Sequence, residues 1–130
     1  MSGSIIKSAE FKTAINDMLK EYGDKCEDAM AEVTPGVANA TRNKVKAGAQ
    51  SVVGPHATGK YAAGWQAKID KKNGGAGFKV YNARVPGLPH LIENGHALRN
   101  GGRTRPRKHI EPVNEWAQEE FVNRLRRKLS

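Results

Sequence analysis

The spacing of the apolar residues changes once along this chain, and that change limits the folds it can adopt. Over residues 8–33 the apolar side chains recur at intervals of three and four, which predicts a long amphipathic helix. Over residues 60–69 they alternate with other residues, which predicts a half-buried β-strand. Gly54-Pro55 separates the two patterns. The expected fold class is therefore α+β, with helices first and an antiparallel sheet after them.

Two helices are predicted in the N-terminal part of the chain. Ser8 is the expected N-cap of the first, and Gly23 is its weak point because glycine costs about 1 kcal/mol inside a helix relative to alanine. Thr34-Pro35 has the pattern of an N-cap followed by proline at the first helical position. We therefore expect the first helix to end near residue 33 and a second to occupy residues 34–53.

The rest of the chain predicts a small sheet and a final helix. Residues 70–77 are polar and glycine-rich and fit a hairpin connection, and residues 78–83 fit the returning strand. Residues 90–94 fit either a short strand or one helical turn. A helix from about residue 111 to 128 should pack across a sheet of three or four strands. The 130 residues fit a single domain, with three large aromatic side chains expected in its core: Trp65, Trp116 and Phe121.

Charge is distributed unevenly along the chain. The net charge is +9, but residues 1–33 contain four lysines against seven acidic residues, which leaves −3 there and +12 on residues 34–130. We expect an acidic surface on the first helix that suits a basic neighbour, and a basic surface that suits nucleic acid. A basic protein with no nucleic-acid role fits the charge equally well.

No set of residues in the sequence predicts catalysis or a cofactor. The single cysteine, Cys26, is interpreted as a small apolar residue on a helix face, and four histidines are scattered over loops without the spacing of a metal site. No acid, base and nucleophile converge, so no enzyme, cofactor or metal is predicted. No segment is apolar enough to span a bilayer or to form a signal peptide at the N-terminus, so we expect a protein made in the cytosol.

Residues 97–109 form the sharpest feature that these elements leave unexplained. The segment is rich in arginine and glycine and cannot form a packed core, so we expect it to be exposed or ordered only by a partner. Its basic side chains suit docking on acidic protein or sequence-blind contact with DNA, since no aromatic residues accompany them for base stacking. The candidate contact residues are Arg99, Arg103, Arg105, Arg107 and Lys108.

Several short motifs occur in a recognisable order. Pro55-His56-Ala57-Thr58-Gly59 precedes the first strand, and Tyr81-Asn82 ends the second. Then come residues 90–96, which contain Glu93-Asn94-Gly95, and residues 105–113, which contain Ile110-Glu111-Pro112. This order resembles the neck or tail-completion proteins of long-tailed bacteriophages over about residues 34–128. The family typically shows Ala-Pro-x-x-Thr-Gly-x-Leu, then Glu-x-Gly-Thr after an aromatic and a hydrophobic residue, then Pro-x-x-Phe-hydrophobic-x-Pro-Ala.

The chain departs from the family pattern at two places. Lys60-Tyr61 follows Thr58-Gly59 where the family has an apolar residue and then arginine or lysine, and His109 stands where an aromatic residue is usual. The motif residues carried over are Thr58, Gly59, Glu93, Gly95 and Pro112. Of these, Glu93 is expected to pair with an arginine of the basic loop.

The resemblance implies a structural virion protein without enzymatic activity. Members form homo-oligomeric rings, here expected to hold six or twelve subunits, in the neck between the head connector and the tail. The implied partners are head-completion proteins, tail-terminator or tail-tube proteins, and genomic DNA that passes through the channel without sequence-specific contact. The implied location is the virion, with assembly in the host cytoplasm and no membrane.

Two other functions remain open from the sequence. A small basic nucleic-acid-binding protein would bind DNA as a monomer with steep salt dependence. A toxin-type RNase of α+β build would use His90 or His109.

Overall fold

The computed structural model describes residues 6–53, 58–70 and 77–130, and within them the chain is α+β as predicted. The predicted break at Gly54-Pro55, the first three residues of the Thr-Gly motif and most of the 70–77 connection lie outside this range. The elements in chain order are β1 (Ile6–Lys7), the 3-10 helix η2 (Ser8–Phe11), α1 (Lys12–Tyr22), α2 (Asp24–Val53), α3 (Lys60–Ala63), β2 (Trp65–Asp70), β3 (Gly77–Asn82), α4 (Pro89–Asn94) and α5 (Glu111–Leu129).

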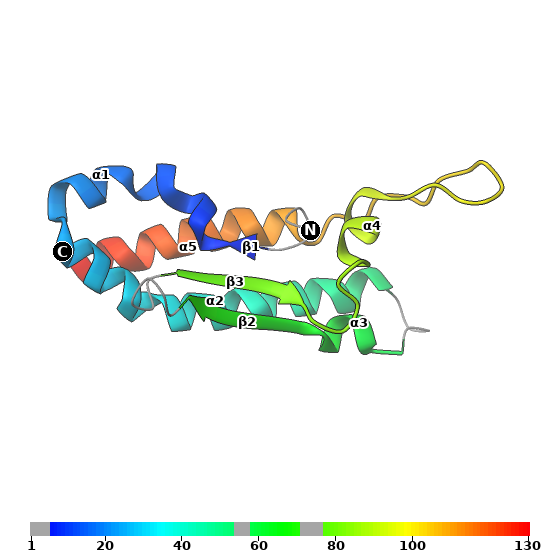
Figure 1. Cartoon of the computed structure of the whole chain (residues 1–130), viewed down its shortest axis with the longest axis horizontal. Helices are drawn as coiled ribbons and strands as arrows, with labels where there is room; N and C mark the ends of the chain where they lie inside the picture. Colours follow the sequence, from blue (N-terminus) through cyan, green and yellow to red (C-terminus); the bar gives the residue numbers. More distant parts are fainter. Residues whose placement is uncertain (1–5, 54–57, 71–76) are drawn as a thin grey trace.

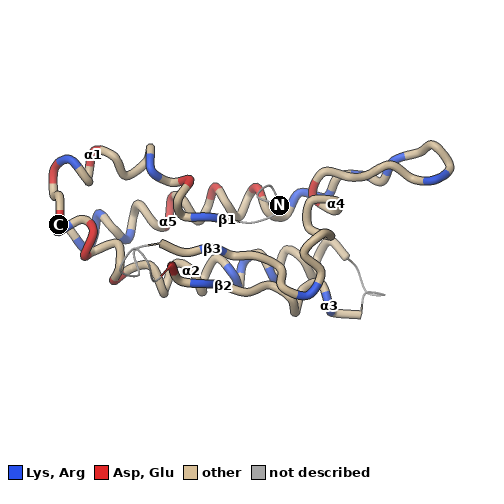
Figure 2. The backbone as a smooth tube through the Cα atoms, in the orientation of Figure 1, with Lys and Arg blue, Asp and Glu red and all other residues tan. Residues whose placement is uncertain are grey.

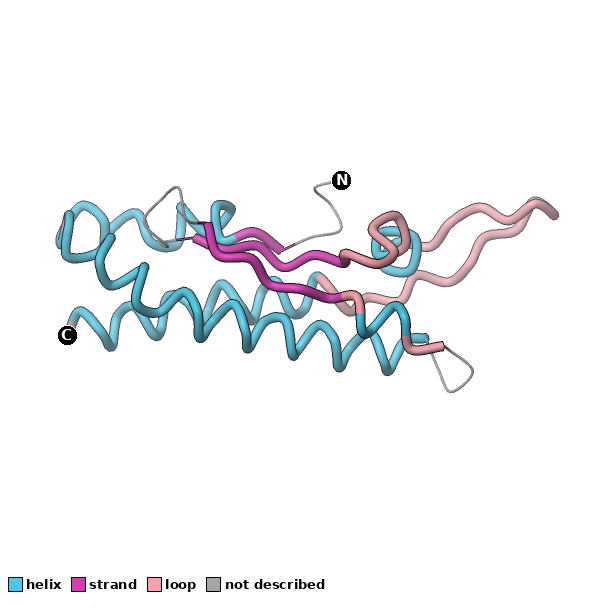
Figure 3. The backbone as a smooth tube through the Cα atoms, turned by 60° about the horizontal axis from the view of Figure 1, so that its bottom comes forward, coloured by secondary structure: helices cyan, strands magenta, loops and turns pink. Residues whose placement is uncertain are grey.

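The sheet lies on a pair of long helices. Its three strands are ordered β1-β3-β2 and all pairs are antiparallel, with Trp65 opposite Asn82 and Asp70 opposite Gly77 in the β2–β3 pair. Helices α2 and α5 run side by side along the long axis and cover one face of the sheet (Figures 1 and 3). The C-terminal helix was predicted to pack across the sheet; it lies mainly against α2 and reaches the sheet through Phe121, whose ring lies against that of Phe78.

Three phenylalanines join segments that are distant in the sequence. Phe11 lies against Phe78 and Phe121 with ring centroids 6.2 Å and 6.1 Å away, and Phe78 and Phe121 are 6.3 Å apart. All three are buried, as is Trp65, which is fully inaccessible. Trp116 is only half-buried and lies under the ammonium group of Lys44, 4.7 Å from its ring centroid. The core prediction is thus confirmed for Trp65 and Phe121, whereas Trp116 lies at the edge of the core.

The boundary between the first two helices lies eleven residues earlier than predicted. The helix breaks at Gly23, which adopts φ 55°, and α2 then continues without interruption through Thr34 and Pro35. Thr34 is not an N-cap: it is buried inside α2, and its hydroxyl donates a hydrogen bond to the Met30 carbonyl at 2.7 Å. Packing of α2 against the sheet and α5 stabilises the helix enough to tolerate the missing amide of Pro35.

The first predicted strand begins five residues later than expected. Residues Lys60–Ala63 form one helical turn, α3, before β2 begins at Trp65. Gly59 precedes this turn with φ 87°, and the Thr58 hydroxyl accepts a bond from the Lys60 amide at 3.4 Å. Thr58-Gly59 therefore leads into a helical turn and not directly into the strand. Residues 90–94 take the helical alternative, in α4, and no described helix is both long and apolar enough to cross a membrane.

The positive φ of Gly23 yields a stability prediction. A Cβ there would meet no heavy atom within 4 Å, so Gly23→Ala introduces backbone strain without a steric clash. We expect Gly23→Ala to lower the free energy of unfolding by roughly 1–2 kcal/mol, measured by urea denaturation. Gly87→Ala is the matched control, because Gly87 also has open space and no positive φ. Equal stability of the two variants would contradict the strain argument.

Candidate functional site

A buried carboxylate, Glu93, caps the N-terminus of α5 from the neighbouring helix α4. Its Oε1 accepts hydrogen bonds from the amides of His109 and Ile110, both at 2.8 Å, and its Oε2 accepts one from the amide of Glu111 at 2.9 Å. The side chain is 5% exposed. The first turn of a helix has amides without partners and a partial positive charge, so a carboxylate there is strongly stabilising. Ile110 is the N-cap residue of α5, and its apolar side chain cannot accept a hydrogen bond from the helix. Glu93 therefore supplies the cap.

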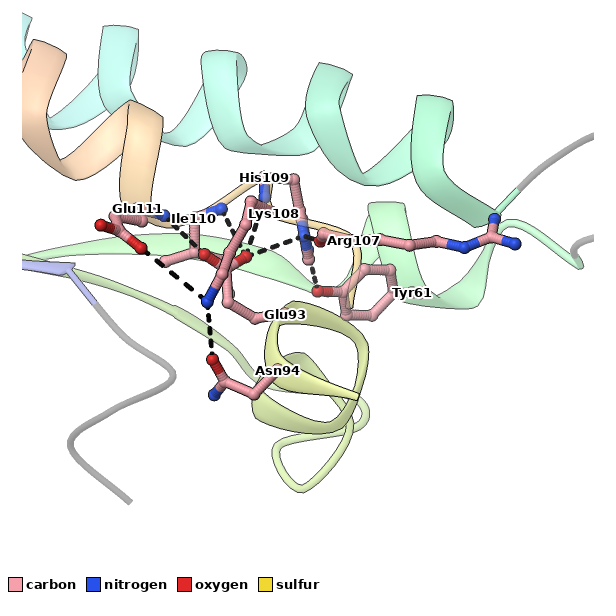
Figure 4. A network of polar contacts seen from close by, with 8 residues as sticks. All are labelled: Tyr61, Glu93, Asn94, Arg107, Lys108, His109, Ile110 and Glu111. Carbon is pink, nitrogen blue, oxygen red and sulfur yellow. Dashed lines mark hydrogen bonds and ion pairs between the residues drawn. The ribbon is translucent and has the colours of Figure 1, made fainter. Parts of the chain in front are cut away.

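His109 and Tyr61 extend this cap toward the sheet. The Nδ1 of His109 lies 3.1 Å from Glu93 Oε1 and 2.9 Å from the Arg107 carbonyl, and its Nε2 is hydrogen-bonded to the Tyr61 hydroxyl (Figure 4). With the proton on Nδ1, the imidazole donates to both oxygens and Nε2 accepts from Tyr61. His109 is 4% exposed. We call Tyr61, Glu93, His109 and the amides of residues 109–111 the anchor.

The electrostatics of the anchor favour an ionised Glu93. Burial by itself raises the pKa of this carboxyl, but the hydrogen bonds from the amides of His109, Glu111 and Ile110, together with the His109 ring, outweigh it and hold the pKa below its usual value. Burial and then the charge of Glu93 raise the pKa of Tyr61 far above its usual range. Tyr61 therefore stays protonated as a donor while Glu93 stays charged as an acceptor.

The segments that carried the family resemblance meet at the anchor. Tyr61 follows the Thr58-Gly59 motif. Its backbone carbonyl accepts a 2.7 Å hydrogen bond from the side-chain amide of Asn82, which is buried at the end of β3. Gly95 has φ 75°, and a Cβ there would lie 2.5 Å from the Thr104 carbonyl, so only glycine fits. Pro112 lies in the first turn of α5, where its missing amide is not needed. Glu93 and Pro112 thus shape the junction of α4 with the start of α5, Gly95 shapes the exit from α4, and the Asn82–Tyr61 bond joins β3 to α3.

The basic loop leaves the anchor as a hairpin. His96 and Thr104 are joined by the 2.9 Å bond from the Thr104 amide to the His96 carbonyl, and Leu98 and Gly102 by a 2.7 Å bond. Ala97 and Arg103 form an antiparallel bridge between them. We call residues 96–105 the arm; it extends beyond the rest of the molecule at one end of the long axis (Figure 1). The arm is exposed, as predicted, but its own backbone bonds give it a defined shape without a partner.

The five candidate contact residues are all exposed but fall into two groups. Arg107 donates to the Val52 carbonyl at the end of α2 at 2.6 Å, and Lys108 binds Asn94 at 2.8 Å and approaches Glu111 at 3.8 Å. Both therefore support the base of the arm. Arg99, Arg103 and Arg105 have no hydrogen bond or ion pair to any other described residue, so they are the ones left for a partner.

Two anchor residues were misjudged from the sequence. His109 was interpreted as one of four loop histidines without a specific role and is buried, and Glu93 pairs with His109 and backbone amides where an arginine was expected. The one available signal was the position of His109, where the resembling family has an aromatic residue. Cys26 is buried in the core as expected, and within the described ranges no three His, Cys, Asp or Glu side chains are grouped to hold a metal.

Comparison of the chain with protein-family models, with curated proteins and with solved structures gives no match.

The cap predicts a specific loss of stability. We expect Glu93→Gln to lower the free energy of unfolding by about 2 kcal/mol, because it removes the charge and turns one oxygen acceptor into a donor that faces the Glu111 amide. Glu111→Gln is the control, since that side chain is 63% exposed and makes only the 3.8 Å ion pair. Urea denaturation measures both. A loss at Glu93 no larger than at Glu111 would show that the cap contributes little.

The lowered pKa of Glu93 predicts how this stability depends on pH. A carboxyl whose pKa is lower in the folded state contributes its full stability above its usual value of 4.5 and loses it as the pH falls through the folded value. The stability difference between the wild-type chain and Glu93→Gln should therefore be constant from neutral pH down to about 5 and shrink below it. Denaturation of both proteins at a series of pH values tests this. A difference that grows on acidification would refute it.

Proposed function

We propose that this protein is a structural virion protein that forms a ring in the neck of a long-tailed bacteriophage, between the head connector and the tail. The observation that carries the proposal is the convergence of separate motif segments on the anchor. Residues 58–59, 81–82, 90–96 and 110–112 carried the resemblance, and their segments are joined by contacts of Asn82 and Glu93. Tyr61 and His109, the two places where the chain departs from the family pattern, complete these contacts. Contacts of this kind give the order and spacing of the motifs a physical basis beyond their short residue patterns.

The arm supports an assembly role over a catalytic one. The anchor fixes both ends of residues 96–105 to the body, and the three arginines beyond it have no partner within the described part of the chain. A hairpin that is already ordered loses little entropy when it binds, which favours docking on a neighbour. Because the anchor is buried and its polar atoms satisfy one another, it supplies shape and not chemistry.

In this function the partners are copies of the chain, head-completion proteins and tail-terminator or tail-tube proteins. Genomic DNA would pass through the ring without sequence-specific contact, since the arm presents arginines but neither aromatic rings nor a recognition helix. The ring would be in the virion, and its subunits in the host cytoplasm during assembly.

A monomeric nucleic-acid-binding protein is the second candidate, and the three unpartnered arginines of the arm favour it. The RNase alternative would use His90 or His109 as an acid or base. Both ring nitrogens of His109 are engaged in the buried anchor. A substrate could reach this imidazole only after the start of α5 had moved away from α4. His90 is half-buried in α4, and its Nδ1 is buried without a hydrogen-bond partner among the described residues.

Native mass spectrometry of the full chain tests the proposed ring. We expect closed oligomers of one size, with six or twelve subunits, at low and moderate salt. DNA binding measured in parallel should be weak and should not increase when the oligomer is dissociated. A chain that stays monomeric and binds DNA with a steep salt dependence would overturn the neck proposal in favour of the nucleic-acid-binding protein.

A further inference from the structure

The arm presents an unusual combination of exposed side chains. Leu98, near its tip, is 41% exposed and is the one large hydrophobic residue classed as exposed within the described ranges. It lies on the same hairpin as Arg99, Arg103 and Arg105. An apolar side chain surrounded by unpaired arginines suits a protein surface with apolar and acidic parts, because a nucleic-acid backbone offers leucine nothing to bury against.

A surface of the opposite charge lies where α1 meets α2. Asp17, Glu21, Asp24, Glu27 and Asp28 are exposed there and have no ion-pair partner among the described residues, whereas Glu32 is paired with Lys128 at 2.6 Å. We call these five residues the acidic corner. Figure 2 shows acidic residues, with basic ones among them, around this bend, and the basic residues of the arm at the far end of the molecule.

The acidic corner carries an excess of negative charge, because its five acids outnumber the two exposed lysines among them, Lys20 and Lys25. Asp17 and Glu21 are four residues apart on α1, and Asp24 and Asp28 are four apart on α2. Like charges at this spacing are neighbours on a helix and repel each other by roughly 0.2–0.5 kcal/mol per pair. For Asp24 the dipole of α2 offsets part of this repulsion, because this residue lies in the first turn of the helix. A cationic partner would reduce this repulsion. The corner lacks cationic partners and the arm lacks anionic ones, so each could supply what the other lacks.

The spacing of the charges also matches. Carboxylates four residues apart on a helix are separated by about 6 Å along the axis. Arg103 and Arg105 are two residues apart in extended chain, which places them roughly 7 Å apart on the same face. Each guanidinium would therefore lie opposite one carboxylate, in the forked geometry that arginine forms with carboxylates.

A groove beside the corner offers a place for Leu98. It has a volume of about 930 Å³ and lies between α1, the first part of α2, the end of β2 and the start of β3. Its lining includes the apolar side chains of Ile15, Leu19 and Met30, and Glu27 belongs to both the groove and the corner. The lining also holds four cations, which would direct the arginines toward the carboxylate side: Lys7, Lys12, Lys68 and Lys79.

We propose that the arm of one copy docks on the acidic corner and adjoining groove of a second copy of this chain. The arm and the corner lie at opposite ends of the long axis (Figure 1), so one copy cannot satisfy both within itself. Repeated head to tail, this contact is heterologous and closes into a ring when the rotation between subunits allows it. The inference rests on the proposed ring, for which it names the contact between subunits.

Charge reversal on each side tests the contact. The arm variant is Arg103→Glu with Arg105→Glu, and the corner variant is Asp17→Lys with Glu21→Lys, which places cations toward the C-terminal end of α1 where the helix dipole favours them. We expect each variant to lower the association constant at about 50 mM salt by roughly tenfold or more, because like charges now face each other. The chain that carries all four substitutions should assemble again. Sedimentation velocity and native mass spectrometry measure the assembly, and circular dichroism confirms that each variant is folded.

The control variant changes the net charge of the chain by the same amount as the arm variant. Lys60→Glu with Arg84→Glu reverses two exposed cations outside the arm, one in α3 and one shortly after β3, and this variant should assemble like the wild-type chain. Rings that persist in the arm and corner variants would overturn the arm contact while leaving the proposed ring in place. Reciprocal dimers that follow the reversal pattern would support the contact and overturn the ring. A wild-type chain that stays monomeric, with DNA binding lost in the arm variant, would overturn both.

Discussion

The rest of the structure depends on one capping interaction, the carboxylate of Glu93 at the N-terminus of α5. Its three amide hydrogen bonds set where α5 begins, and through His109 and Tyr61 they tie that point to α3 and the end of β3. The amide of Arg107 adds a 2.8 Å bond to the Ile92 carbonyl of α4. Both ends of the arm are thereby joined to the body, one through Gly95 and one through the start of α5. A single buried charge can do this because its partners are a helix terminus and an imidazole, which compensate its lost hydration.

The fold class could be predicted from the sequence because it follows from periodicity, which is a local property. The helix boundary could not, because two local signals competed and packing decided between them. Thr34-Pro35 is a good helix start in isolation, but Thr34 lies against the core within a helix that contacts both α5 and the sheet. Gly23 is the only position near this boundary with a positive φ, so the chain bends there. The alternating pattern over residues 60–69 misled in the same way, since α3 buries Tyr61 just as a strand would.

The candidate site also has one part that local sequence features predict and one part that depends on tertiary contacts. The composition of the segment predicts exposed arginines in the arm, and they are exposed in the structure. The anchor could not be predicted in this way, because it joins residues up to 48 positions apart that look unremarkable singly. A histidine in a loop and a glutamate before Asn-Gly carry no local sign of burial. The order of the motifs, together with the place of His109 in it, was the sequence signal for the anchor, and this order reflects a set of tertiary contacts.

The division between anchor and arm also explains why so basic a chain can have an acidic segment. If the arginines of the arm had paired with acids on the body, the arm would lie against it and present no charge to a neighbour. The acids are instead separated from the arm by the length of α2, whose 30 residues span about 45 Å. The separation leaves an excess of positive charge at one end of a single copy and an excess of negative charge at the other. In the proposed contact between copies these two charges would meet, and the strength of that contact should depend on salt because all of the charges involved are exposed.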